Sequence, residues 1–579
     1  MADRGKWTGA GRRAPADAAI IAGMLLSLAA YYVVPAPLLC LPPLLVFGVL
    51  AWFRLEAALC LLPLTFPFWY VPKQVAGQVV FPLSEIVLAV CAAVALAQGA
   101  RHLPALRHRL PRLARAPLGR SGPRLALGAL LLALGTAIGI VIAPRPHEAL
   151  RAWRWEVAEP LLYFALVVLV VRRPWRAAHL LVWAMLGSAA MVAALATIQV
   201  FWLHVTFAPL AQGNKLLPFA TAAGAVPRAT AIIYGSGNSL GAWLARAIPL
   251  ALALAFTLAR GQKRPRDMYS MASGAERWLA GVCALLCLPA LMWSASRGAW
   301  VACVAGCAII AGGWLWSAFS TRATRLRDAW RRRDRGWWRW GWVVAALGVL
   351  AVALLVVWQP VVALAGLLLA GHGGSGEVRL LLWRSALAML RDHPLFGVGP
   401  DQFLSYYSPH FSAHPYWMPV LNGHPTLAAR EPDLSHPHNL LLEVWLSGGL
   451  LAVVGFVLLA VEALRRAAKL HHGAAGWQSA AALGLLGAVV AMLVHGLVDS
   501  AYFAPDLALW FWWALALVVT LERTIPRRAE RTSYSVPLRR GEGGQKAGDA
   551  GANDEGGHSR SPHAEAKLCA EGHKGARER

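Results

Sequence analysis

Three residues whose types could do chemistry stand directly before a long apolar run, in the stretch SHPHN at residues 435–439. His436 and His438 are separated by one proline, and Asn439 precedes the apolar residues that begin at Leu440. An imidazole titrates near neutral pH, so a histidine at this place could take a proton from a substrate. Two such histidines could also ligate a metal ion, although zinc needs at least one further ligand. Asparagine favours the N-cap position, which predicts a helix beginning at Leu440.

Other ionisable residues stand inside or at the ends of further apolar runs. Arg297 lies in the segment SASRGAW between two runs, and Glu443 lies one turn into the helix predicted after His438. In HGLVDS, His495 and Asp499 are four residues apart, which predicts that they share one helical face. Ionisable groups at membrane depth are functional candidates, because burying them in an apolar environment is costly.

Two more segments add polar residues to this group. The segment PRATAIIYGSGNSLGAW places Arg228 and Asn238 ahead of an apolar run. Residues 377–391 have the periodicity of a short amphipathic helix, which would fit the membrane interface. That helix would carry Arg379 and, four residues later, Trp383.

Arginine and histidine together suit one kind of reaction. A guanidinium binds phosphate through two N–H donors and stays charged at physiological pH. A histidine can take the proton of an attacking hydroxyl group. This combination predicts transfer of a group from a diphosphate-activated lipid to a hydroxyl, with arginines stabilising the departing diphosphate. The remaining histidines of the segment 370–439 have no ligand-like spacing, and the cysteines lie in apolar runs except Cys569, so no metal site is predicted.

The elements that must position these residues are membrane helices. Of the 579 residues, 58% are hydrophobic and only 15% are charged, which excludes an ordinary soluble domain. Many apolar runs reach the length of about 20 residues that crosses a bilayer core. The runs predict 14 spans, or 12 to 13 if some of the first four are re-entrant. They are 16–34, 36–53, 55–71, 79–98, 125–143, 158–172, 178–203, 238–259, 279–296, 299–319, 341–369, 440–463, 478–496 and 504–521.

The distribution of positive charge predicts the orientation. The formal net charge of +26 is divided among loops between apolar runs, which indicates topology rather than nucleic-acid binding. The segment 101–124 carries seven arginines and no acidic residue, and 321–340, 172–176, 260–266 and 465–469 are also basic. Under alternation these loops fall on one side together with both termini. The positive-inside rule predicts that this side is the cytoplasm, and that SHPHN faces outward.

The same pattern predicts the division of the chain. We expect a cytoplasmic amino-terminal segment at 1–17, a transmembrane domain at 18–521, and a large outer loop at 370–439 within it. The loop lacks the basic bias of the opposite side, and long loops among short connections often carry function. The segment 522–579 is rich in Gly, Ser, Arg and Glu and poor in apolar residues, which predicts a disordered cytoplasmic tail.

The motifs SHPHNLLLEVWLSGGLL, VRLLLWRSALAMLRDHPLFGVGPDQF, SRGAW and HGLVDS resemble those of the O-antigen ligase/O-antigen polymerase superfamily, over about residues 228–510. The resemblance implies an all-α polytopic protein of the bacterial cytoplasmic (inner) membrane, with about 12–14 transmembrane helices, one large periplasmic loop and a GT-C-like fold. It implies a glycosyltransferase that takes a glycan from an undecaprenyl-diphosphate donor in surface polysaccharide biosynthesis, such as lipopolysaccharide. The family acts without a metal ion or other cofactor, and its ligases invert the anomeric carbon.

Carried over residue by residue, the resemblance assigns catalytic roles. His438 matches the family's essential histidine and is expected to be the general base, while Arg379 and Arg297 are expected to hold the diphosphate. We expect eight further residues to contact the substrates: His436, Asn439, Arg228, Asn238, Trp383, Glu443, His495 and Asp499. One ligase pattern fits Gly449 but not Ala452, which leaves ligase and polymerase both open.

Several alternatives remain at this level. The same arginines could bind diphosphate in a transporter or flippase of lipid-linked sugars, although no internal repeat supports this. The acceptor could be the lipid A core, a growing polymer, a teichuronic-type polymer or a protein, as in a protein O-oligosaccharyltransferase. The sequence determines neither the sugar nor the oligomeric state.

Overall fold

The chain divides into two units, Met1–Ile525 and Pro526–Arg579. The computed structural model describes residues 10–75, 78–79, 81–100, 122–203, 205–207, 216–218, 228–256, 274–330, 375–416 and 434–525, all in the first unit. Several predictions concern residues outside those described: the span at 341–369, the basic segment 260–266, most of the basic segment 101–124, residues 331–340 of the basic segment 321–340, residues 1–9 of the amino-terminal segment, residues 370–374 and 417–433 of the outer loop, and residues 526–579 of the tail.

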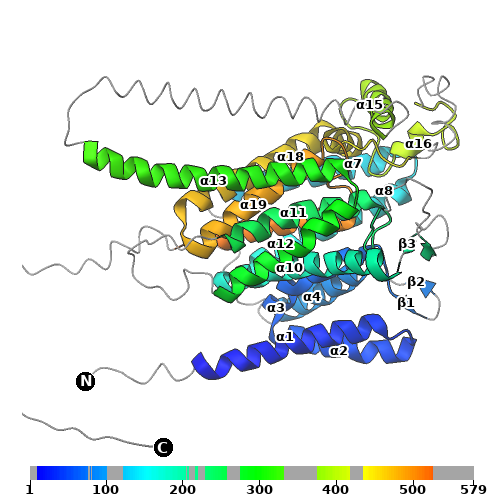
Figure 1. Cartoon of the computed structure of the whole chain (residues 1–579). Helices are drawn as coiled ribbons and strands as arrows, with labels where there is room; N and C mark the ends of the chain where they lie inside the picture. Colours follow the sequence, from blue (N-terminus) through cyan, green and yellow to red (C-terminus); the bar gives the residue numbers. More distant parts are fainter. Residues whose placement is uncertain are drawn as a thin grey trace, which may run out of the picture. The chain divides into compact units, whose positions relative to one another are not determined.

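The described residues are almost entirely helical (Figure 1). The helices up to residue 203 are α1 (Ala10–Val33), α2 (Pro37–Phe53), α3 (Leu55–Leu61), the 3₁₀-helix η1 (Leu62–Trp69), α4 (Leu83–Ala100), α7 (Gly122–Ile142), α8 (Pro146–Trp153), the π-helix η2 (Arg154–Ala158), α9 (Glu159–Val170), α10 (Pro174–Ile198) and the π-helix η3 (Gln199–Leu203). The later helices are α11 (Gly237–Ala255), α12 (Gly274–Trp293), α13 (Arg297–Trp330), α15 (Ser375–Asp392), α16 (Phe403–Tyr407), α18 (Leu440–Gly473), α19 (Gly476–His495) and α20 (Pro505–Glu522).

Two short antiparallel ribbons are the strands found among the described residues. β1 (Gln74–Val75) pairs with β2 (Gln78–Val79), and β3 (Val205–Phe207) pairs with β4 (Leu216–Pro218). In the second ribbon Thr206 lies opposite Leu217. Both ribbons connect helices and contribute nothing to the site described below.

Nine helices of the described part are long and apolar enough to cross a membrane: α4, α7, α10 with η3, α11, α12, α13 (in Arg297–Leu315), α18, α19 and α20. They correspond to nine of the predicted spans. The first three predicted spans form shorter apolar helices, Asp17–Val33, Pro37–Phe53 and Leu55–Trp69. The prediction of an all-α polytopic membrane protein is confirmed.

The span predicted at 158–172 begins earlier than its apolar run. α8, η2 and α9 follow one another without interruption from Pro146 to Val170. The π-helical turn in the middle carries Glu156. A π-turn inserts an extra residue into the helix and often occurs near functional sites, because it redirects side chains.

Helix α18 packs closely along α7 through glycines. A Cβ atom on Gly135 of α7 would lie 2.6 Å from the carbonyl oxygen of Gly448. Likewise, a Cβ atom on Gly455 of α18 would lie 2.4 Å from the backbone nitrogen of Leu132. Small residues allow membrane helices to approach until their backbones touch, which fixes the position of α18.

A break in α18 lets the segment after α15 dock beside it. Gly449 has φ of +65°, and a Cβ atom there would collide with the carbonyl oxygen of Leu395. The N–H of Leu450 donates to that oxygen at 3.0 Å, and the N–H groups of Val398 and Gly399 donate to the carbonyl of Leu446 at 2.7 and 3.0 Å. The backbone groups released by the break are therefore bonded within the protein, as an apolar environment requires.

The predicted amphipathic helix at 377–391 is confirmed as α15. Its buried stripe consists of Leu381, Leu382, Ala386 and Met389. This stripe packs with α16 and the amino-terminal part of α18 (Figure 1). α15 is therefore fixed next to the start of α18, and this packing positions Arg379, which α15 carries.

Candidate active site

The site is built around the start of α18. Asn439 is the N-cap predicted from the sequence: its Oδ1 accepts hydrogen bonds from the N–H groups of Leu441 and Leu442, both at 3.1 Å. Its Nδ2 donates to the carbonyl oxygen of Leu497 at 3.1 Å. One side chain thus starts the helix and also anchors the turn that follows α19.

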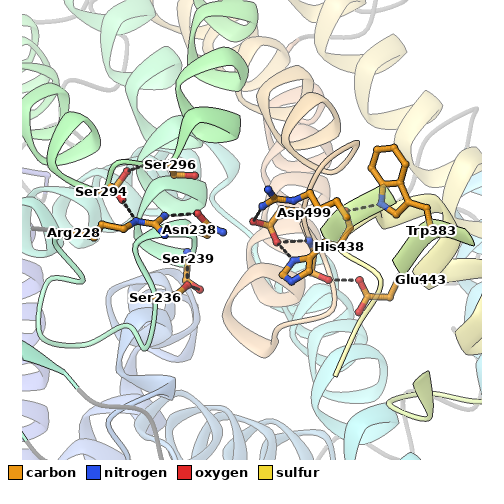
Figure 2. A network of polar contacts seen from close by, with 12 residues as sticks. Arg228, Ser236, Asn238, Ser239, Ser294, Ser296, Trp383, His438, Glu443 and Asp499 are labelled. Atoms are coloured by element: carbon orange, nitrogen blue, oxygen red, sulfur yellow. Dashed lines mark hydrogen bonds and ion pairs between the residues drawn. The ribbon is translucent and has the colours of Figure 1, made fainter. Parts of the chain in front are cut away.

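His438 contacts a buried carboxylate. Its Nδ1 lies 2.7 Å from Oδ1 of Asp499, which also accepts the N–H of Ser500 at 2.9 Å. The other carboxylate oxygen of Asp499 lies 3.6 Å from Nη2 of Arg379. Figure 2 shows His438 and Asp499 facing each other. His438 has φ of +51°, a conformation that residues other than glycine rarely adopt and that occurs most often at functional sites.

This geometry determines the protonation of the ring. Burial by itself raises the pKa of Asp499, but the hydrogen bond with His438 and the nearby charges of His495 and Arg379 together hold that pKa well below its usual range. Asp499 is therefore ionised near neutral pH and can only accept hydrogen bonds. The proton of a neutral His438 must lie on Nδ1, which leaves Nε2 unprotonated and able to accept a proton.

α15 supplies two of the predicted residues from adjacent turns. Arg379 forms the ion pair with Asp499, and Trp383, four residues later, lies on the same face of the helix. The indole N–H of Trp383 donates to the carbonyl oxygen of His438 at 3.4 Å. α15 is thereby bonded both to the side chain of Asp499 and to the backbone of His438.

His436 lies against His438 with a different environment. The two rings are nearly perpendicular, with their centroids 4.3 Å apart. The Nδ1 atom of His436 is buried and has no hydrogen-bond partner among the described residues. Burial and the adjacent His438 lower the pKa of His436 to about 4, so this ring stays neutral near neutral pH. His436 is therefore a poorer base than an ordinary imidazole.

A second cluster surrounds Arg228. Its Nη2 donates to Oδ1 of Asn238 at 2.7 Å, and its Nε donates to the carbonyl oxygen of Ser294 at 3.2 Å (Figure 2). Gly237, at the start of α11, permits this arrangement because a Cβ atom there would lie 2.4 Å from the Ser294 oxygen. The predicted pair Arg228 and Asn238 is therefore in direct contact, with the amide orienting the guanidinium.

The arginines of the two clusters act on one another. Arg228 interacts electrostatically with Arg379, Arg297 and Asp499. Arg297 is the exposed first residue of α13. Arg228 therefore lies within electrostatic range of Asp499 and of two other guanidinium groups, which concentrates positive charge where an anion would be held.

One sequence prediction is wrong. His495 and Asp499 were expected to share a helical face, but α19 ends at His495, and Asp499 lies in the turn after it. The helix ends there because the carbonyls of Gly496 and Leu497 accept hydrogen bonds from the start of α18. His495 is buried, and neither of its ring nitrogens has a hydrogen-bond partner among the described residues.

Glu443 is connected to the site through a residue that was not predicted. The hydroxyl of Ser500 donates to Glu443, which is buried one turn into α18. Ser500 directly follows Asp499, so one short turn carries the carboxylate behind His438 and also contacts Glu443. The residue is the last letter of the motif HGLVDS, but its role depends on the turn, which the sequence pattern does not reveal.

The structure thus brings His438, Asp499, Arg379 and Trp383 into direct contact, with His436, Asn439, Glu443 and His495 around them. Within the described part of the chain, no group of three or more His, Cys, Asp or Glu residues is arranged to hold a metal ion.

Comparison with known proteins identifies the region that contains this site. Residues 282–457 match the family model of the O-antigen ligase domain. The match lies inside the predicted core of 228–510 and includes Arg297, Arg379 and His438. No curated protein matches the chain. The chain is therefore a polytopic membrane protein in which residues 282–457 match the O-antigen ligase domain, and this match supports the O-antigen ligase/polymerase superfamily.

Proposed function

We propose that the protein transfers or polymerises a glycan from an undecaprenyl-diphosphate donor onto a hydroxyl acceptor at the periplasmic face of the inner membrane. Glycan transfer of the O-antigen ligase/polymerase type follows from the family; the donor, the residues and the side of the membrane are proposals. The observation that carries them is the 2.7 Å contact between His438 Nδ1 and Asp499, whose other oxygen pairs with Arg379.

In this mechanism His438 is the general base. The acceptor hydroxyl gives its proton to Nε2 while its oxygen attacks the anomeric carbon of the donor sugar. Asp499 holds the ring in the required tautomer and stabilises the imidazolium that forms, as a buried carboxylate does behind other catalytic histidines. General-base assistance of this kind typically contributes about 10²- to 10⁴-fold in rate.

The arginines act on the leaving group. As the bond between the anomeric carbon and the diphosphate oxygen breaks, the electron pair stays with the diphosphate, whose negative charge increases. Arg379 and Arg297 are proposed to stabilise this charge, and Arg228, oriented by Asn238, is proposed to extend the binding site. This chemistry uses only protein side chains, so we propose that it requires no metal ion or other cofactor.

The two ends of α18 support the proposed side of the membrane. Beyond the break at Gly449, the helix continues to Gly473 for about 36 Å, which is enough to cross the hydrocarbon core of a bilayer. His438 precedes one end, while Arg465, Arg466 and Lys469 lie near the other. Because basic segments favour the cytoplasm, we propose that the site faces the periplasm and that both termini are cytoplasmic.

The test is transfer by the purified protein. The wild-type protein in proteoliposomes, supplied with lipid-linked glycan and acceptor, is expected to form a new glycosidic bond that mass spectrometry detects. His438→Ala should reduce the rate about 10²- to 10⁴-fold while leaving folding unchanged. Movement of the donor across the bilayer without bond formation would instead identify a transporter, and full activity of His438→Ala would exclude this histidine as the base.

A further inference from the structure

A small cavity lies beside the proposed base and takes no part in the mechanism above. Its volume is about 50 Å³, and its walls come from five places: the π-turn of η2, residues 399–403 at the start of α16, the residues before His438, the first two turns of α18, and Phe503 ahead of α20. By this measure it has room for about four water molecules. A space of this size accommodates the hydroxyl groups along one edge of a sugar ring.

The lining of the cavity is acidic and polar. Glu156, Asp401 and Glu443 contribute three carboxylates, and Glu156 interacts electrostatically with the other two. Among the described residues, neither lysine nor arginine lines the cavity. An ionised carboxylate accepts hydrogen bonds and a protonated carboxyl group can also donate one, so these three groups suit a ligand that is rich in hydroxyl groups.

A buried nitrogen lies in the same wall. His436 lines the cavity, and its Nδ1 is buried without a hydrogen-bond partner among the described residues. An unsatisfied buried polar atom costs about 1–3 kcal/mol, so a ligand that supplies the missing bond gains affinity. Because a neutral imidazole presents one donor and one acceptor, it can satisfy a sugar hydroxyl.

Other contacts hold the cavity in shape. The side chain of Gln402 exchanges hydrogen bonds with the backbone of Arg145, at 3.2 Å from the N–H and 3.4 Å to the carbonyl. At the opposite wall, Glu443 is held by the hydroxyl of Ser500. The walls are therefore fixed before a ligand binds, which reduces the entropy that binding costs.

The cavity is continuous with the catalytic dyad. His436 and Pro437 line it, and the next residue is His438. On the other side, Ser500 connects Glu443 of the cavity wall to Asp499 of the dyad. A hydroxyl-bearing ligand in the cavity would thus lie alongside the histidine that must take its proton, while the arginines that suit diphosphate come from other elements.

We propose that this cavity is the subsite for the acceptor sugar, and that its carboxylates select an uncharged, hydroxyl-rich sugar over one that carries phosphate or carboxylate. The inference rests on the proposed transferase function and adds the acceptor's chemistry to it. Discrimination against an anion arises at Asp401. Burial raises the pKa of Asp401 to about 6, so its carboxyl group is mostly ionised near neutral pH and repels an anion, and repulsion of the wrong partner is an effective source of specificity.

The test compares acceptor and donor kinetics in Asp401→Asn and Glu156→Gln. Both variants replace a carboxyl group by an amide with little change in shape, and asparagine tolerates the φ of +57° at residue 401. The acceptors are octyl glucoside and the same glucoside with a phosphate on its primary hydroxyl. We expect the KM for the neutral acceptor to rise about 10-fold, as for one lost charge-assisted hydrogen bond. The preference over the phosphorylated acceptor should narrow, while the KM for the donor stays unchanged.

The control is Asp392→Asn, which removes a carboxylate outside the cavity, bonded to the hydroxyl of Tyr416. It should leave both acceptor KM values unchanged. If the wild-type protein transfers glycan but neither cavity variant changes the acceptor KM or the preference, the cavity proposal is wrong and the proposed function stands. If the wild-type protein forms no glycosidic bond with any acceptor, the proposed function itself fails.

Direct labelling gives a readout that is independent of turnover. Octyl glucoside carrying a diazirine on its primary carbon, activated by light, should cross-link to peptides within 399–403 and 435–447. Excess octyl glucoside should suppress this labelling, and inorganic phosphate should not. Labels that map only to lipid-facing helices, or that excess octyl glucoside does not displace, would overturn the proposal.

Discussion

Charged residues cluster at both ends of α18, but they pair with one another at the carboxyl end and are only partly paired at the amino end. At the carboxyl end, Glu462 accepts hydrogen bonds from Arg465 at 3.1 and 2.9 Å and from Arg466 at 3.1 Å. Arg466 also donates to Glu522 of α20 at 2.7 Å. Glu462 and Arg466 are each only 2% exposed, so this network is buried and its charges neutralise one another.

At the amino end the charges are only partly matched. Asp499 pairs with His438 and Arg379, but a buried nitrogen of His436 and both ring nitrogens of His495 have no hydrogen-bond partner among the described residues. Buried polar groups in folded proteins are normally satisfied, and exceptions concentrate where a substrate or water is to bind. The comparison indicates that one end of the helix holds the fold together and the other is prepared for a ligand.

Asp499→Asn is expected to have the largest effect. The amide can donate to Nδ1 and so favours the wrong tautomer of His438, which should lower kcat about 10²- to 10⁴-fold with little loss of stability. Steady-state transfer rates together with thermal unfolding would measure both quantities. If Asp499→Asn lowers the unfolding temperature in proportion to its loss of activity, the role of Asp499 is structural, like that of the charged residues at the carboxyl end of α18.

Glu462→Gln should have the opposite outcome. Removing the charge of Glu462 leaves Arg466 with Glu522 as its remaining carboxylate partner and weakens the bonds of Arg465, which should cost about 1–3 kcal/mol of folding stability. The folded fraction should keep its kcat. The matched control is Glu148→Gln, in an exposed pair 3.6 Å from Arg145, where a loss of under about 1 kcal/mol is expected. Equal unfolding temperatures for the two variants would contradict this assignment.

Two substitutions of Asn439 distinguish its capping bonds to Leu441 and Leu442 from its bond to Leu497. Asn439→Ala removes the cap and should cost about 0.5–2 kcal/mol of stability. Asn439→Asp keeps the accepting oxygen for Leu441 and Leu442 but loses the donor to Leu497, so it should retain stability and still reduce transfer. Unfolding temperatures and rates for both variants test this. If the two lose activity only in proportion to stability, the bond to Leu497 has no role in positioning Asp499.

His436 should give the smallest effect, and it depends on pH. In the unfolded chain the ring takes up a proton as the pH falls through about 6.5, whereas burial lowers the folded-state pKa to about 4. The unfolded state therefore binds more protons in this window, and stability falls as the pH drops from about 6.5 to 4. Groups facing His436 include His438, Asp499 and Arg379.

His436→Gln cannot take up this proton. Its unfolding temperature should therefore fall less than that of the wild type between pH 7 and pH 5, which thermal unfolding in detergent measures at each pH. An identical slope in both proteins would show that His436 contributes nothing to the acid sensitivity.

Much of the site could be predicted from residue types and local spacing. His438 and Asn439 precede an apolar run, and Arg379 and Trp383 are four residues apart in an amphipathic segment, so each was predicted with its local element. The prediction that His495 and Asp499 share a helical face was wrong, because the sequence pattern suggests that α19 continues past His495. The bonds that end the helix come from α18, about 60 residues earlier in the chain.

The sequence by itself determined the membrane-helical class, the amphipathic α15 and the helix start at Asn439, because these depend on hydrophobic periodicity and capping within a few residues. Only the tertiary structure decided that Asp499 faces His438, that Ser500 connects it to Glu443, and that Glu156 and Asp401 share a cavity. Those contacts join residues up to hundreds of positions apart. They exist because glycines let α7 and α18 approach closely and because the break at Gly449 lets the segment after α15 dock against α18.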